Sequence, residues 1–191
     1  TADRIASTGA VALNGTLTLA SIVNAADFKT YTILSAASIT GTFTGLPDRT
    51  LFTQLDHDFV ISCTATTVTL TQVTPGYTWV WDGGSTVDDN WKTDANWVND
   101  VAPCIGANLQ FAGTVRMSPV NDFPADTSFA SITFNSGADA FTLSGNRITL
   151  TGDITNNDNS VQTLNLDMIM AETRNFNAAS GDMAVGGVLS G

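Results

Sequence analysis

Hydrophobic and polar residues alternate with a period of two through several short segments of the chain. This period is typical of strands of about four to seven residues that bury one face. In the first part of the chain it predicts strands within residues 15–21, 30–34, 38–46 and 58–73. Phe59, Ile61 and Cys63 share one face of the last segment, so the Cys63 side chain is expected to point inward.

The same kind of pattern returns after residue 104, with Gly, Asn or Asp between the strands. It predicts strands within residues 109–113, 114–118, 131–137, 140–145, 147–156 and 161–170. The side chains expected to form the core are Leu109, Phe111, Ile132, Phe134, Phe141, Leu143, Ile148, Leu150, Ile154, Leu164, Leu166, Met168 and Met170. No helix-length periodic segment interrupts these strands, so we expect an all-β protein.

A turn-rich segment that holds all four tryptophans separates the two strand regions. Pro75 and Gly76 end the first alternating pattern, and Pro103 precedes the second. We therefore predict a β-solenoid or terminal coil over residues 1–75, a Trp-rich cap or connector over residues 76–103, and a β-solenoid over residues 104–191.

Two all-β architectures fit this succession of strands. One is an antiparallel β-sandwich, and the other is a β-solenoid whose strands wind as stacked coils. An approximate repeat favours the solenoid, because residues 141–160 and 163–182 each have the length of one coil, about twenty residues.

Composition supports strands and restricts the partners. The chain has 29 Thr but one Glu and two Lys, and β-branched residues favour strands over helices. With a net charge of −11 and scattered basic residues, we expect neither nucleic acid nor an anionic membrane surface as a partner.

No apolar run reaches the roughly 18 residues of a membrane span, so we expect no membrane insertion of this segment. Residues 1–10 lack the pattern of a signal peptide and suggest a mature or excised piece.

Residues 78–113, "TWVWDGGSTVDDNWKTDANWVNDVAPCIGANLQFAG", and residues 129–157 resemble the autotransporter-associated β-strand repeat proteins. In that family a Trp-x-Gly motif, a second Trp, an Asn-Trp pair and a Pro-containing loop come before the coils. In this chain the matching residues are Trp81 with Gly83, then Trp91, then Asn96 with Trp97, and finally Pro103. The first 75 residues resemble the coil that often ends such a solenoid.

This resemblance implies a right-handed parallel β-helix in a large secreted protein of the bacterial cell surface. We therefore expect a non-enzymatic, structural, extracellular segment that contributes to a stalk, a fibre or an adhesive layer. The expected partners are further copies or sister repeat segments, and surface glycans.

The four tryptophans, Trp79, Trp81, Trp91 and Trp97, allow two interpretations. Exposed indole rings could stack on sugar rings, with Asp82 or Asp88 bonding hydroxyls, in a carbohydrate-binding module. Alternatively, the rings cover an open solenoid end, where strand edges and apolar core need closure. We favour the cap.

An enzyme would require a base, an acid or a metal site. His57, the only histidine, lies between two aspartates. Polysaccharide-degrading β-helix enzymes use clustered Asp, Lys or Arg; Asp153 and Asp158 have Arg147 nearby but no Lys. The simpler interpretation is a solvated histidine and turn-forming aspartates. We therefore predict no catalytic residue, no cofactor and no metal site.

Three further questions stay open from the sequence. Calcium could bind within residues 153–159 or at residues 88–90, because both offer oxygen ligands. Cys63 and Cys104 form a disulfide only if the loop after Pro103 folds back over the strand of Cys63. Joining Gly191 of one copy to Thr1 of the next would continue the strand pattern, so copies are expected to stack head to tail into filaments, unless the coils continue within one long chain.

Overall fold

A computed structural model describes residues 3–22 and 26–191 of the protein. Two compact units divide the chain, Thr1–Tyr77 and Thr78–Gly191. The regular elements of the described residues are β-strands and two single-turn 3₁₀ segments, with no α-helix among them, and the prediction of an all-β fold is confirmed.

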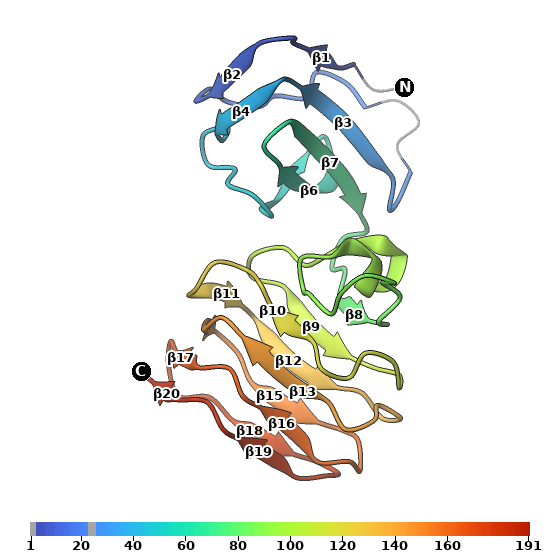
Figure 1. Ribbon diagram of the computed structural model, residues 1–191, viewed down its shortest axis with the longest axis vertical. Helices are drawn as coiled ribbons and strands as arrows, with labels where there is room; N and C mark the ends of the chain where they lie inside the picture. The colour runs from blue at the N-terminus through green and yellow to red at the C-terminus, as the bar shows by residue number, and fades with distance from the viewer. Residues whose placement is uncertain (1–2, 23–25) are drawn as a thin grey trace. The chain divides into compact units, whose positions relative to one another are not determined.

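The second unit is a β-solenoid of about four turns, as predicted (Figure 1). Its strands are β8 (Trp79–Trp81), β9 (Asn108–Phe111), β10 (Val120–Asn121), β11 (Thr127–Phe129), β12 (Ser131–Phe134), β13 (Thr142–Gly145), β14 (Ile148–Leu150), β15 (Ile154–Asn156), β16 (Gln162–Leu164), β17 (Met168–Met170), β18 (Phe176–Ala178), β19 (Met183–Val185) and β20 (Leu189–Ser190). They form three parallel ladders, β8-β9-β12-β15-β18, β10-β13-β16-β19 and β11-β14-β17-β20.

Each coil adds one strand to every ladder and takes about twenty residues. Ile132 pairs with Ile154, and Ile154 pairs with Phe176, so like residues lie above one another in successive coils. Of the thirteen predicted core residues, all are fully buried except Met170, which is half-buried. The period of two therefore identified the inner face of the solenoid.

The first unit contains a pair of parallel coils and an antiparallel sheet. Its strands are β1 (Ile5–Ala6), β2 (Ala10–Leu13), β3 (Thr30–Ser35), β4 (Ser38–Gly41), β5 (Leu51–Gln54), β6 (His57–Cys63) and β7 (Thr67–Val73). β1 lies parallel to β3, and β2 lies parallel to β4. β7 is antiparallel to both β3 and β6, and β5 is antiparallel to β6. Coils alone were predicted over residues 1–75, and the hairpins of β5 to β7 depart from that expectation.

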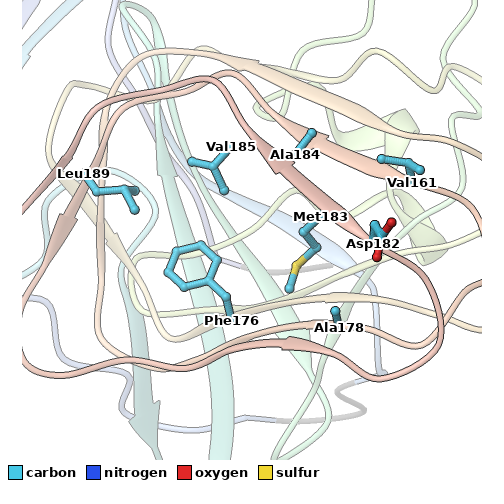
Figure 2. A pocket seen from close by; sticks show the side chains of 8 residues that line it. All are labelled: Val161, Phe176, Ala178, Asp182, Met183, Ala184, Val185 and Leu189. Atoms are coloured by element: carbon cyan, nitrogen blue, oxygen red, sulfur yellow. The ribbon is translucent and has the colours of Figure 1, made fainter.

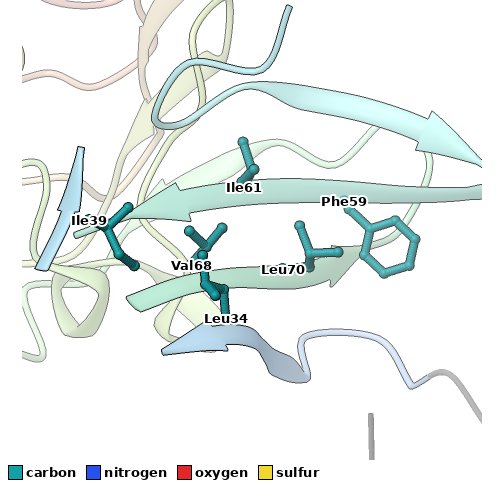
Figure 3. Close-up of a cluster of buried hydrophobic side chains, with 6 residues drawn as sticks. All are labelled: Leu34, Ile39, Phe59, Ile61, Val68 and Leu70. Carbon is teal, nitrogen blue, oxygen red and sulfur yellow. The ribbon is translucent and has the colours of Figure 1, made fainter. Parts of the chain in front are cut away.

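A tight turn explains the first hairpin. Leu55 and Asp56 both have positive φ, 51° and 61°, and Gln54 pairs with His57 across the turn. Two such residues give a turn whose twist matches paired antiparallel strands. Leu34, Ile39, Phe59, Ile61, Val68 and Leu70 form the buried core beneath this sheet (Figure 3).

Two predicted strands are absent from the structure. Residues 15–21 are not a strand, although Leu17 and Leu19 still contact the core. The Gln54 side chain takes the place of a neighbouring strand there, because its Oε1 accepts from Leu19 N and its Nε2 donates to Leu17 O. Residues 114–118 are also irregular and carry Arg116 from β9 to β10.

Glycine allows close contact between coils at the end of one strand in each unit. Gly41 (φ 73°) pairs with Leu13, and Gly145 (φ 107°) pairs with Asn121. A Cβ atom on Gly41 would lie 2.3 Å from Leu13 O, and one on Gly145 would lie 2.4 Å from Asn121 O. Both positions need a positive φ and an absent side chain.

We predict that Gly145→Ala lowers the free energy of unfolding by about 2 kcal/mol or more, because a strained φ and a backbone clash act together. Gly113→Ala is the control, since Gly113 also has a positive φ (79°) but no atom within 4 Å of its Cβ position. Urea unfolding followed by tryptophan fluorescence measures both. Equal losses would show that contact between coils at Gly145 is unimportant.

Candidate functional site

The tryptophan segment forms a partial coil on the first coil of the second unit. β8 lies parallel to β9, with Trp79 opposite Leu109 and Trp81 opposite Phe111. Further along, Trp91 N donates to Val120 O at 2.9 Å, so this part of the segment adds to the ladder of β10. The segment therefore covers two of the three ladders at the start of the solenoid. We call residues 79–103 the tryptophan cap.

Phe111 is the centre of the aromatic packing beneath the cap. The ring centroids of Trp81, Trp91 and Trp97 lie 6.1, 5.7 and 5.9 Å from that of Phe111. Phe134 and Phe141 contact Phe111 at 5.7 and 5.6 Å and continue the aromatic packing into the coils. Large aromatic side chains bury much apolar surface, and tilted or edge-on pairs are favourable.

Asn96 joins three backbone groups of the cap. Its Nδ2 donates to Asp88 O at 3.0 Å and to Asn90 O at 3.1 Å, while its Oδ1 accepts from Ser85 N at 3.2 Å. Asn96 is fully buried, so these bonds satisfy groups that water cannot reach. In the Asn-Trp pair of the sequence, Asn96 thus supplies buried hydrogen bonds within the cap, and Trp97 supplies a packed ring.

Arg116 holds the cap from the first coil, a role that the sequence analysis did not predict. Its guanidinium forms an ion pair with Asp89 and donates through Nε to Ser85 O. Its backbone oxygen accepts from Trp81 Nε1 at 3.2 Å. Gly83 lies against the same segment, where a Cβ would be 2.6 Å from Val115 O. Arg116 is the only arginine between residues 50 and 146, which is the one available signal.

The burial of the tryptophans decides what the cap can contact. Trp81, Trp91 and Trp97 have no exposed surface, and Trp79 is 3% exposed. A sugar ring stacks on an exposed aromatic face, and none of these four rings presents one. The packing therefore fits closure of the solenoid end, with all four rings turned into the core.

His57 lies at the β5–β6 hairpin of the first unit and is half-buried. Its ring is 6.4 Å from that of Phe59, and the neighbouring Asp58 accepts a short hydrogen bond from Thr53 Oγ1. Asp153 and Asp158 belong to the second unit.

Asp153 and Asp158 bond to neighbouring coils through their carboxylates. Asp153 Oδ1 accepts from Asn175 N at 2.9 Å, and Asp158 accepts from Ser160 N and from Gly137 N. Hydrogen bonds from Asn175 lower the pKa of Asp153, and those from Ser160 and Gly137 lower the pKa of Asp158. Carboxylates held in their charged form are poor proton donors, and both act as turn residues here.

The candidate calcium ligands have other partners. Asp88 Oδ1 accepts from Asn90 N and from Thr93 Oγ1, and Asp89 pairs with Arg116. Among the residues that the structure describes, no group of three or more His, Cys, Asp or Glu side chains is placed to hold a metal ion.

The cysteines belong to different units. No disulfide is present within residues 3–22 and 26–191, and Cys63 and Cys104 are both thiols. Cys63 is half-buried in β6, and this burial, with a smaller effect of the nearby Asp48 charge, raises its pKa to about 11. A thiol with this pKa is almost entirely protonated at neutral pH and therefore reacts slowly.

The last coil contains an apolar hollow. It is lined by the inner side chains of β18, β19 and β20, including Phe176, Met183, Val185 and Leu189 (Figure 2). Val185 and Leu189 are 40% and 47% exposed, whereas Leu164 and Met168, their partners in the previous coil, are fully buried. The same core positions that are closed within the stack are therefore accessible at this coil.

Comparison of the chain with protein-family models, with curated proteins and with solved structures gave no match. Within the described part of the chain, no helix has the length and apolar character needed to cross a membrane.

We predict that Trp91→Ala lowers the free energy of unfolding by about 3–5 kcal/mol, because it removes a fully buried ring at the cap. Val87→Ala is the matched control in the same segment, since Val87 is 85% exposed and its truncation should change stability by less than about 0.5 kcal/mol. Urea unfolding monitored by far-UV circular dichroism gives both values. An unchanged stability in Trp91→Ala, with a loss of glycan binding, would instead favour the carbohydrate module.

The stability of the second unit should depend on pH through Asp153 and Asp158. Because the pKa of Asp153 and of Asp158 is lower when folded than the usual 3.8, their carboxylates stabilise the fold above that pH. This contribution is lost as the pH falls below 3.8 through the lower folded values. Asp158→Asn should therefore lower the melting temperature at pH 6 and reduce the further drop between pH 5 and pH 3. Asp100→Asn, outside the coil turns, serves as the control, and identical profiles for both variants would contradict the prediction.

Proposed function

We propose that this protein is a structural, non-enzymatic β-solenoid segment of a large extracellular protein on the bacterial cell surface. The observation that carries this proposal is what the side chains of the candidate site contact. The tryptophans, the buried amides and the turn aspartates bond or pack against neighbouring coils. The side chains that would be candidates for chemistry therefore maintain the stack.

The mechanism is additive. Each coil forms backbone hydrogen bonds with the next at a spacing of about 4.8 Å and adds a layer of apolar side chains to the core. Side chains strengthen these contacts at the turns. Gln162 Oε1 accepts from Phe141 N in the previous coil, and Asn156 Nδ2 donates to Asp182 O in the next. A stack of this kind holds its ends at a fixed distance, which suits a stalk or fibre.

Adhesion would use the outer faces of the coils. One outer column contains Gln110, Thr133, Thr155 and Asn177 at paired positions of β9, β12, β15 and β18. These hydroxyl and amide groups are uncharged, although the chain has a net charge of −11. Such a column suits contacts with neutral surface glycans, and copies or sister segments stacked head to tail would lengthen it.

Localisation tests this proposal. Antibodies raised against the 191-residue chain should label intact cells that carry the gene as strongly as permeabilised cells. External protease should remove this signal without lysing the cells. Labelling that requires permeabilisation would overturn the proposed extracellular location. Catalytic turnover of a polysaccharide that is lost in Asp153→Asn would overturn the proposed non-enzymatic role.

A further inference from the structure

Among the strand edges that have no strand partner in the described residues, two sets face opposite ways within their own stacks, one toward a preceding coil and one toward a following coil. β1 and β2 pair on one side only, with β3 and β4, which follow them in the chain. β18, β19 and β20 also pair on one side only, but with strands that precede them. In a parallel stack, the edge facing the following coil pairs with the edge facing the preceding coil. The two sets are therefore complementary in direction.

The remaining two ends of these stacks are covered. In the first unit, β7 pairs with the other edge of β3, and Ala65 O accepts from Ile39 N beside β4. In the second unit, β8 and the rest of the tryptophan cap cover the first coil. At these ends β3 of the first unit and two ladders of the second unit are thus covered, whereas β11 has no strand partner on that side.

The two stacks also contain strands of the same kind. β4 and β13 each end in a glycine with positive φ, Gly41 and Gly145, whose Cβ position is filled by a backbone oxygen of the paired residue. This equivalence places β2 and β4 in the same position of a coil as β10, β13, β16 and β19. β1 and β3 come directly before them, so they take the position of β15 and β18.

Apolar side chains are accessible at both edges. Phe176, Met183, Val185 and Leu189 line the hollow of the last coil (Figure 2). On the other edge, Ile5 of β1 is 69% exposed. Contact between the two edges would cover both sets and would pair backbone groups that otherwise stay exposed, as in strand addition.

We propose that the last coil of one copy binds the first coil of a second copy, with β1 beside β18 and β2 beside β19. The proposal rests on the proposed structural function and names the partner of its open coil edge. The contact joins two different surfaces, so each joined copy keeps one open edge for another copy. The product is an open-ended chain of copies.

The direction of the backbone groups identifies the positions at which proline blocks each edge. Asp182 O and Gly186 N bond to the previous coil, so the groups of Val185 point to the open edge, because alternate residues face opposite sides. On β2, Gly9 O bonds toward β4, which directs the groups of Ala12 to the open edge by the same alternation. Proline at Val185 or Ala12 removes an edge N–H without removing a bond within the coil pair.

Sedimentation velocity of the 191-residue chain tests the proposal, with Ala12→Pro, Val185→Pro and the matched controls Ala12→Thr and Val185→Ile, which keep the edge N–H. The original chain and both controls should form larger species as concentration rises to about 1 mM. Each proline variant alone should lose all species beyond the monomer. An equimolar mixture of the two should form a one-to-one dimer, since each variant retains the edge that the other lacks.

Circular dichroism and melting temperature establish that each variant is folded. Ala10→Pro and Met183→Pro, two residues away on the same strands and therefore facing the same edges, replace any proline variant that is not. An original chain that stays monomeric overturns the proposal. Assembly of the original chain with no dimer in the mixture also overturns it, because another surface must then be responsible. Neither result bears on the surface location of the protein, which the antibody experiment tests separately.

Discussion

A solenoid coil satisfies its backbone hydrogen bonds through its neighbours in the stack, and the other features of this protein follow from that requirement. A two- or three-residue strand such as β10 or β20 has little stability by itself. Stacking in register makes these strands part of continuous parallel ladders and buries the same side-chain position in successive coils. The first and last coils of any stack then lack a neighbour on one side. Their strand edges and apolar side chains are either covered by other parts of the chain or left exposed.

Two different solutions cover an end in this chain. The first unit uses antiparallel strands, which can pair with a parallel strand edge and then turn back by short hairpins. The second unit uses a partial coil that carries large rings, and Phe111 contacts three of them. Strand pairing satisfies mainly the backbone, whereas the aromatic cap also fills the wide apolar interior. Both covers are built from residues that precede or follow the coils directly, so one end of each stack is covered by its own local sequence.

Sequence pattern predicted the interior of the solenoid well because side chains of a strand alternate strictly between faces. It predicted the tryptophans as a cap because four large rings in one turn-rich segment suit a small core. β10, β11 and β18 to β20 were not anticipated, since strands of two or three residues are too short to show a period. Residues 114–118 alternate like a strand but are irregular, because Arg116 is used for contacts with Ser85 and Asp89. The Leu55–Asp56 turn lacks the glycine that usually marks such hairpins.

The tryptophan cap also has a place in the order in which the chain is synthesised. It comes before all the coils of its unit in the chain, and it presents a complete apolar surface and a strand edge at β8. β9 to β11 can bury their inner side chains on that surface as soon as they are synthesised, and each later coil uses the one before it. A solenoid that ordered coil by coil from the cap would acquire its structure in the same direction as the polypeptide is made.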